Sequence, residues 1–171
     1  MLESLKPAVT ACQKEFGAEV EEFRDEVSLI VEPGKNVEAL QALRERFGFN
    51  FLIDVTAVDY WPQETPRFHV LYHLVGLDTN VVLRVRVPLD GNNPSLRTSE
   101  TVWPSANWYE REVFDMFGIR FEGHSDLRRI IMPFEWEGYP LRKDYPLGYE
   151  EVQFTFNFDE INLTKPKGTE L

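Results

Sequence analysis

Residues 103–147 read WPSANWYEREVFDMFGIRFEGHSDLRRIIMPFEWEGYPLRKDYPL, and this stretch decides how the second half of the chain folds. Its first part predicts a helix over residues 105–117, because Pro104 suits a first helical turn and Gly118 suits the left-handed residue after a helix. At about 100° per residue, one side of this helix is a wide apolar arc. The arc consists of Ala106, Tyr109, Val113, Phe114, Met116 and Phe117.

Glu110 lies inside this apolar arc, where an unpaired carboxylate costs several kcal/mol. We therefore expect Glu110 to be buried and paired with a downstream residue, His124, Arg128 or Arg129. The favoured interpretation is a structural pair that fixes the turn after the helix. A carboxylate tuned for acid–base chemistry is the functional alternative.

The opposite side of the same helix is predicted to be polar. It carries Trp108, Arg111, Glu112 and Asp115. Arg111 and Asp115 are spaced for an i,i+4 ion pair, so we expect them to pair with each other on the helix surface.

Residues 130–147 are predicted to form an extended ribbon. Ile130 and Ile131 have strand character, but Pro133, Pro140 and Pro146 forbid a long helix and disfavour a central strand. Such a ribbon bonds little to itself and must lie against another surface. Its aromatic and charged residues have the composition of protein–protein hot spots. They are Trp136, Tyr139, Arg142, Lys143, Asp144 and Tyr145.

Upstream, hydrophobic periodicity predicts two helices, over residues 5–16 and 37–47, each followed by glycine. Short strands are expected over 18–23 and 26–31. Alternation of period two predicts three more strands, over 51–58, 68–74 and 81–87, and places Phe51, Ile53, Val55 and Ala57 on one face. Short turns favour an antiparallel meander in an antiparallel or mixed sheet, with one face covered by the two helices. The expected fold class is α+β.

We divide the chain into an α+β domain, residues 1–129, and an extended partner-binding ribbon with a C-terminal arm, residues 130–171. In the arm, Val152, Phe154, Phe156 and Phe158 alternate with polar residues, which predicts a strand. This strand either joins the domain's own sheet or, as we favour, pairs with another chain.

Composition excludes several classes of function. A length of 171 residues with 43% hydrophobic content suits one packed domain, and a formal net charge of −11 disfavours nucleic acid or anionic lipid as direct partners. The apolar runs fall short of the ~20 residues of a transmembrane helix, and the N-terminus lacks a secretory signal pattern. The single Cys12 cannot ligate an iron–sulfur cluster, which needs about four thiolates. No glycine-rich phosphate loop occurs. We therefore expect no redox cofactor in this chain.

The histidines are the remaining candidates for metal binding or catalysis. His69 and His73 share a strand face but stand ~13 Å apart at about 3.3 Å per residue, too far to share a metal. His124 and Asp126 form a candidate dyad, yet no serine or cysteine nucleophile motif lies beside them. We expect His124 to bond to the backbone or to Glu110, and we predict no metal ligands and no catalytic residues.

Several motifs of the 103–147 stretch resemble the signature of the 30-kDa-type subunit of respiratory complex I, the C-type subunit of bacterial NADH:quinone oxidoreductase. The resemblance covers about residues 99–147. It is carried by Glu110-Arg111-Glu112, Asp115-Met116-Phe117-Gly118, Gly123-His124-Ser125-Asp126-Leu127-Arg128-Arg129-Ile130, Trp136-Glu137-Gly138 and Pro140-Leu141-Arg142-Lys143-Asp144-Tyr145. One position departs, because the family usually has proline after the histidine and this chain has Ser125.

The resemblance implies a scaffold subunit in the hydrophilic arm of the complex, without a cofactor of its own. It implies docking against the D-type subunit, which helps to form the quinone site, next to the B-type subunit, which carries the terminal iron–sulfur cluster. FMN, iron–sulfur clusters and quinone then lie in or between partner subunits, which pass electrons from NADH to quinone and couple them to proton pumping. The chain would be peripheral, bound through its partners to the cytoplasmic face of the bacterial inner membrane. The implied interface residues are Glu110, Arg111, Glu112, Asp115, His124, Asp126, Arg128, Arg129, Trp136, Tyr139, Arg142, Lys143, Asp144 and Tyr145.

Two alternatives stay open. The same module would serve in a ferredoxin- or F420-linked dehydrogenase or a membrane-bound hydrogenase, because other chains decide the electron donor. A different class would be a small polar-ligand binding protein or an acid/base enzyme that uses paired carboxylates such as Glu110 and Glu112. Their i,i+2 spacing points them about 200° apart on a helix, which argues against that class.

Overall fold

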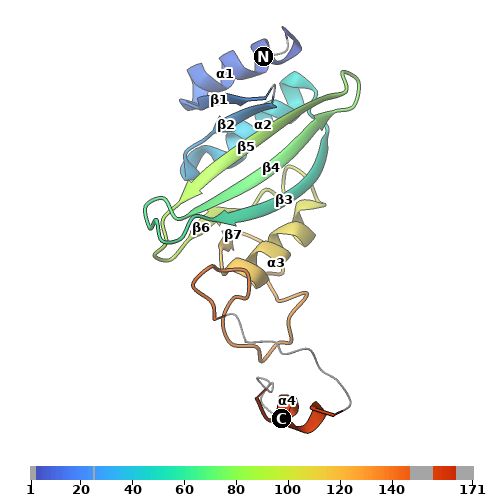
Figure 1. Ribbon diagram of the computed structural model, residues 1–171. Coiled ribbons are helices and arrows are strands. Elements are labelled where there is room, and N and C mark those ends of the chain that lie inside the picture. The colour runs from blue at the N-terminus through green and yellow to red at the C-terminus, as the bar shows by residue number, and fades with distance from the viewer. Residues whose placement is uncertain (1–2, 25, 147–155, 165–171) are drawn as a thin grey trace.

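The computed structural model describes residues 3–24, 26–146 and 156–164 (Figure 1). Within them, a five-stranded sheet in the order β1-β2-β5-β4-β3 forms the centre of the fold. Its strands are β1 (Glu19–Phe23), β2 (Glu26–Ile30), β3 (Phe51–Asp59), β4 (Phe68–Gly76) and β5 (Val81–Leu89). The last three form the predicted antiparallel meander, while β2 pairs with β5 in parallel. The expected α+β class with a mixed sheet is confirmed.

Two N-terminal helices pack against this sheet, as their periodicity predicts. α1 (Lys6–Phe16) follows the 3-10 turn η1 (Glu3–Leu5), and α2 (Asn36–Phe47) follows η2 (Pro33–Lys35). In Figure 1, α2 lies behind the sheet and leaves the opposite face toward the viewer. Cys12 is part of the core and has no exposed surface. Burial raises the pKa of its thiol to about 11, which fits a core side chain and not a reactive thiolate.

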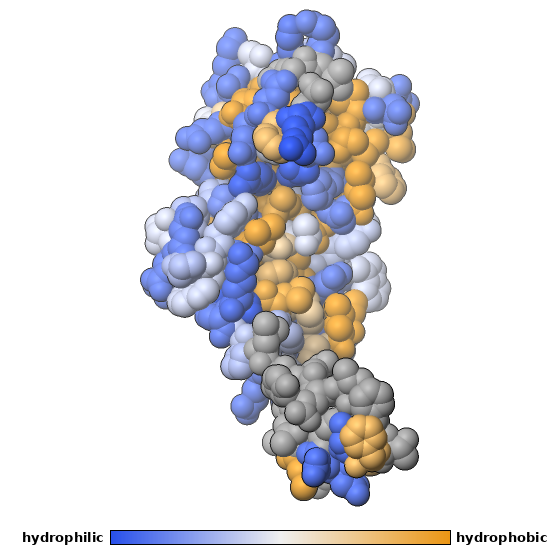
Figure 2. All heavy atoms as spheres, in the orientation of Figure 1, coloured by the Kyte–Doolittle hydropathy of each residue, from blue (hydrophilic) through white to orange (hydrophobic). Residues whose placement is uncertain are grey.

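A β-bulge reverses the faces of the first residues of β3. The register with β4 shifts between Leu52 and Asp54, so Leu52 is buried while Phe51 and Ile53 are 50% and 38% exposed. The predicted common face of Phe51, Ile53, Val55 and Ala57 is therefore wrong in its first half, because one inserted residue inverts the alternation. Figure 2 shows hydrophobic atoms among polar ones on the sheet face turned toward the viewer.

The third helix, α3 (Ala106–Phe117), lies beside β3 and begins and ends close to the predicted positions. Gly118 has the expected left-handed conformation, with φ of 72°. A small parallel pair of strands, β6 (Ser95–Arg97) and β7 (Arg120–Glu122), flanks the helix in sequence. α3 thereby connects the sheet to the ribbon that follows (Figure 1).

The ribbon extends away from the sheet and is described up to residue 146, without helix or strand, as its prolines predict. The division of the chain at residues 129 and 130 stays a prediction. The strand predicted over residues 152–158 lies mostly outside the described residues. In its described part it is wrong, because residues 156–157 form a turn and Phe158 begins the short helix α4 (Phe158–Thr164). Among the helices of the described residues, none is long and apolar enough to cross a bilayer.

Candidate functional site

Two residues of the predicted polar side of α3, Arg111 and Asp115, are buried at the start of the ribbon, while Trp108 and Glu112 are exposed. Asp115 is 0% exposed, and its Oδ2 accepts the backbone N–H groups of Ile130, Ile131 and Met132 at 3.0, 2.7 and 2.9 Å. Its Oδ1 accepts from Arg129 Nη1 at 2.6 Å. Burial alone raises the pKa of Asp115, but these donors outweigh it and hold the pKa below its ordinary value. One carboxylate thus fixes three successive residues of the ribbon on the helix.

Arg129 extends this anchor along the ribbon. Its Nη2 donates to the carbonyl oxygens of Trp136 and Gly138 at 2.9 and 3.0 Å. Its guanidinium lies 5.5 Å from the centre of the Tyr139 ring, within range of a cation–π contact. Arg129 therefore ties the middle of the ribbon to the carboxylate of Asp115.

Arg111 is also turned toward the ribbon. It is only 8% exposed, and its Nε and Nη2 donate to the carbonyl oxygens of Arg128 and Arg129 at 3.2 and 3.4 Å. Its guanidinium stacks over the ring of Trp108 at 5.1 Å. The predicted surface ion pair between Arg111 and Asp115 is therefore wrong. Arg111 binds the two carbonyl oxygens just before the ribbon, and Asp115 binds Arg129 and amides of the ribbon.

A second anchor joins the end of the ribbon to the β3–β4 connection. Arg67 Nη2 lies 2.9 Å from Asp59 Oδ2 and 2.6 Å from Asp144 Oδ1, and Arg67 Nε donates to Asp59 Oδ1 at 3.0 Å. The backbone N–H of Lys143 donates to Asp59 Oδ2 at 2.9 Å. Burial alone raises the pKa of Asp59, but Arg67 and the amides of Lys143 and Trp61 outweigh it and bring this pKa down to about 2. The Arg67 and Asp59 side chains are 7% and 1% exposed, so this pair is buried, while Asp144 lies at the surface.

Arg142 and Tyr139 pack the ribbon against the end of α3. Arg142 Nε donates to the carbonyl oxygen of Phe117 at 2.6 Å, and its guanidinium lies 5.2 Å from the Phe68 ring centre and 4.7 Å from that of Tyr139. The Tyr139 ring covers Gly118, where an added Cβ would lie 2.5 Å from a ring carbon. Glycine is therefore required here for the close approach as well as for the positive φ.

Glu110 is buried as predicted, with 0% exposure, but its predicted partners are wrong. Its Oε2 accepts from the Thr98 hydroxyl at 2.5 Å, and its Oε1 accepts from the Ser99 amide and hydroxyl at 2.7 and 2.6 Å. These donors lie before the helix in the chain, whereas His124, Arg128 and Arg129 lie after it. Burial raises the pKa of Glu110 despite these three donors. The carboxylate fastens the loop before α3 to the helix.

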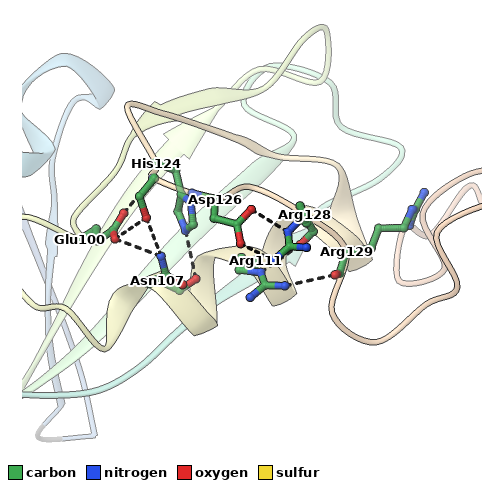
Figure 3. A network of polar contacts seen from close by, with 8 residues as sticks. Glu100, Asn107, Arg111, His124, Asp126, Arg128 and Arg129 are labelled. Carbon is green, nitrogen blue, oxygen red and sulfur yellow. Dashed lines mark hydrogen bonds and ion pairs between the residues drawn. The ribbon is translucent and has the colours of Figure 1, made fainter.

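A surface network holds the 123–126 turn on the first turns of α3 (Figure 3). His124 Nδ1 accepts from the amide of Asp126 at 3.0 Å, so its Nε2 carries the proton and donates to the carbonyl oxygen of Asn107 at 3.1 Å. The predicted backbone bonding of His124 is confirmed. Glu100 accepts from Asn107 Nδ2 at 3.0 Å and from the Ser125 hydroxyl at 2.7 Å. Ser125, the residue that departs from the family's proline, is thus well bonded in this turn.

Of the remaining predicted residues, some are exposed and others are partly buried against the ribbon. Asp126 and Arg128 form an exposed bidentate pair at 2.6 and 2.7 Å, and Glu112 is exposed, so the Glu110–Glu112 acid–base arrangement does not form. Trp136 and Tyr145 are half-buried. The rings of Tyr139 and Tyr145 lie against Gly118 and Gly138, and Lys143 contributes its backbone N–H while its side chain is exposed.

Sequence reasoning missed the partners that lie far along the chain. Asp59, Arg67, Thr98, Ser99 and Glu100 complete the anchors. Only Asp59 could have been found from the sequence. It follows Val55 and Ala57 at every second position of the strand, so alternation places its carboxylate on the buried face.

His69 and His73 lie on the open face of β4 and contact arginines of β5. His73 Nδ1 is 2.6 Å from Asp54 Oδ1, and its Nε2 accepts from Arg84 Nε at 3.0 Å. His69 Nδ1 lies 3.2 Å from Arg86 Nη2. Within the described part of the chain, no group of three or more His, Cys, Asp or Glu residues is placed to hold a metal ion.

Taken together, the anchors hold an extended segment on an α+β domain. This architecture is that of an α+β domain carrying an anchored ribbon with exposed apolar side chains. The family model described as "Respiratory-chain NADH dehydrogenase, 30 Kd subunit" matches residues 29–151. The chain belongs to this family, which confirms the resemblance carried by the 103–147 stretch. As a complex I subunit of the 30-kDa type, it associates with other subunits of NADH-quinone oxidoreductase.

Relatives and solved structures agree with this family. The NADH-quinone oxidoreductase C subunit of Roseiflexus sp. (strain RS-1) is 49% identical over 147 residues, which are 85% of this chain and 84% of the relative. The same subunit of Geobacter sulfurreducens is 44% identical over 143 residues, 82% of this chain and 88% of the relative. The trypsin-resistant fragment (1-134) of Nqo5 has a TM-score of 0.64 and 34% identity, and covers 72% of this chain and 99% of its own.

A chain of the membrane-bound sulfane sulfur reductase, an archaeal respiratory membrane complex, has the same fold. Its TM-score is 0.73 at 26% identity, over 85% of this chain and 87% of its own.

Proposed function

We propose that this chain is a scaffold subunit of a proton-translocating NADH:quinone oxidoreductase, without a redox centre or catalytic residue of its own. It docks on the D-type subunit, which helps to form the quinone site, and positions it next to the B-type subunit. Electrons pass from NADH to quinone through FMN and iron–sulfur clusters of those other chains. The protein is peripheral and reaches the cytoplasmic face of the inner membrane through its partners.

One observation carries this proposal: the ribbon is rigidly anchored, yet it leaves large apolar side chains in solvent. Ile130, Ile131, Phe134 and Leu141 are 40%, 58%, 89% and 54% exposed. Their backbone is held by Asp115 and Arg129, so little further ordering is needed when a partner covers them. Exposed apolar groups on a fixed backbone are what a protein interface requires.

Co-purification with the D-type and B-type subunits of the same complex tests the docking. Ile131→Asp places a charge in the interface and should abolish co-purification. Leu77→Asp is the matched control, because Leu77 is 61% exposed in the β4–β5 turn at the far end of the sheet (Figure 1). It should co-purify like the wild type. Equal recovery of both variants would place the interface elsewhere.

The absence of a redox centre is tested on the purified chain itself. The single Cys12 is buried in the core, which motivates the expectation of no visible absorbance and no stoichiometric iron or zinc. A stoichiometric cluster or flavin in the purified protein would overturn this part of the proposal.

A second candidate is the equivalent subunit of a complex with another electron donor, such as ferredoxin, F420 or hydrogen. The similarity to a chain of the archaeal sulfane sulfur reductase favours it, since the same module occurs in a different respiratory complex. Isolation of the native complex and assay with NADH, reduced ferredoxin and F420 separates the two candidates.

A further inference from the structure

Several of the family's signature side chains face inward in this structure. Arg111, Asp115 and Arg129 bind backbone groups of the ribbon and of the residues just before it, and Asp144 binds Arg67. Asp115 has no exposed surface, and the side chain of Arg129 is 15% exposed. Arg111, Asp115 and Arg129 therefore shape the ribbon from beneath it.

The ribbon that they hold contains a tight turn over residues 133–136. The amide of Trp136 donates to the carbonyl oxygen of Pro133 at 3.1 Å, so Phe134 and Glu135 occupy the two central positions. The chain before the turn is held by Asp115 through Met132, and the chain after it by Arg129 through the Trp136 carbonyl. Both ends of the turn are therefore fixed by contacts within this chain.

Phe134 at the tip of this turn is 89% exposed, more than the other three apolar side chains of the ribbon, Ile130, Ile131 and Leu141. An aromatic side chain has few rotatable bonds, and here its backbone is already ordered. Its burial in a partner's pocket would gain hydrophobic free energy at a small entropic cost. This is the geometry of a hot-spot residue.

The charges beside Phe134 indicate the chemistry of that pocket. Glu135 and Glu137 are both exposed, on a chain whose formal net charge is −11. The nearby cation Arg129 directs its Nη2 to carbonyl oxygens of the ribbon. A partner surface that receives this turn therefore needs an apolar centre and a basic rim.

We propose that the 133–136 turn is a preformed plug, and that Phe134 enters an apolar pocket of the D-type subunit rimmed by lysine or arginine residues that meet Glu135 and Glu137. This inference rests on the proposed function, because the D-type subunit is the docking partner named there. Asp115 is a positioning residue: it holds the turn and touches no partner.

Binding of the full chain to the purified D-type subunit, without and with the B-type subunit, tests this inference at low and high salt. Phe134→Ala should raise the Kd about 30-fold or more, the effect of losing a hot-spot residue. Phe23→Ala is the matched control, since Phe23 is a 64% exposed phenylalanine at the end of β1, and it should change the Kd less than about twofold. The double variant Glu135→Lys, Glu137→Lys should weaken binding at low salt and remove most of its salt dependence.

Asp115→Asn should weaken binding as well, and adding Phe134→Ala to it should cost less than Phe134→Ala costs alone. That non-additivity is expected if Asp115 acts through the turn, and a general loss of stability would not produce it. Circular dichroism checks that each variant is folded.

The outcomes separate this inference from the proposed function. If the wild-type chain does not bind the D-type subunit, the proposed function fails. If it binds and Phe134→Ala behaves like Phe23→Ala, the turn is not the contact and this inference is wrong. If Phe134→Ala weakens binding but the double lysine variant leaves the Kd and its salt dependence unchanged, the basic rim is refuted.

Discussion

Asp115→Asn is the most informative single substitution, because Asp115 joins α3 to the start of the ribbon and the substitution hardly changes the shape of the side chain. The carboxylate accepts three backbone N–H groups and Arg129 Nη1. An amide has only one acceptor oxygen, so it either faces the backbone N–H groups and turns its NH2 toward Arg129, or the reverse. In both cases either Arg129 or the three backbone N–H groups face the NH2 donor of asparagine in place of a carboxylate oxygen.

The expected loss is about 3–5 kcal/mol, the range for removing one partner of a buried, hydrogen-bonded ion pair. For a chain of 171 residues, that corresponds to a fall in the melting temperature of roughly 6–20 °C. The ribbon can also detach and let water solvate these groups. The global loss is then limited to the free energy that held the ribbon in place.

Amide hydrogen exchange is therefore the direct assay. The N–H groups of Ile130, Ile131 and Met132 lose their acceptor in Asp115→Asn and should exchange much faster, while the amides of β4 keep most of their protection. Glu112→Gln is the control, because Glu112 lies on the same helix and is exposed. If Asp115→Asn and Glu112→Gln give the same melting temperature and the same exchange at 130–132, the anchoring role of Asp115 is refuted.

The other anchors lead to three further predictions. Asp59 and Asp115 have folded pKa values below those of the unfolded chain, about 2 for Asp59, so they stabilise the protein above about pH 4 and this contribution is lost as the pH falls toward 2; melting temperatures should drop in that window, and a flat profile would contradict the prediction. Glu110→Ala leaves two hydroxyls and one amide without their acceptor and should cost about 2–4 kcal/mol. Because burial raises the pKa of Glu110, this cost should grow as the pH is lowered from neutral toward about 4, as measured by denaturant titration at several pH values. Gly118→Ala should destabilise more than Gly48→Ala by about 1–3 kcal/mol, because both glycines have positive φ but only at Gly118 would the new Cβ meet the Tyr139 ring; equal losses in thermal melts would show that the ring moves aside freely.

Local periodicity in the sequence was sufficient to predict most elements of this fold. Alternation of period two predicted β3, β4 and β5, and Pro104 and Gly118 predicted the approximate limits of α3. These signals are reliable because a side chain's direction on a strand or helix follows from its position along that element. The bulge in β3 broke this rule locally. Its inserted residue inverts the faces of the residues before it, and the apolar and polar side chains there alternate as in a regular strand, so the sequence does not reveal the bulge.

The sequence by itself also determined the family, because rare residue types recur at fixed offsets over residues 99–147. It predicted that Glu110 is buried, since the helical wheel places it in an apolar arc. It did not determine the partners of Glu110, Arg111 or Asp115. A helical wheel describes which side a residue occupies, and it contains no information about what covers that side.

Only the tertiary structure decided those partners. Asp115 binds backbone groups 15 to 17 residues further along the chain, and the pairs that close the second anchor, Arg67 with Asp144 and Asp59 with Lys143, are 77 and 84 residues apart. A backbone N–H is common to all residues except proline, so sequence cannot mark which amides a carboxylate will bind. The position of the ribbon on α3 makes that choice, because packing brings these particular amides to a buried carboxylate that requires donors.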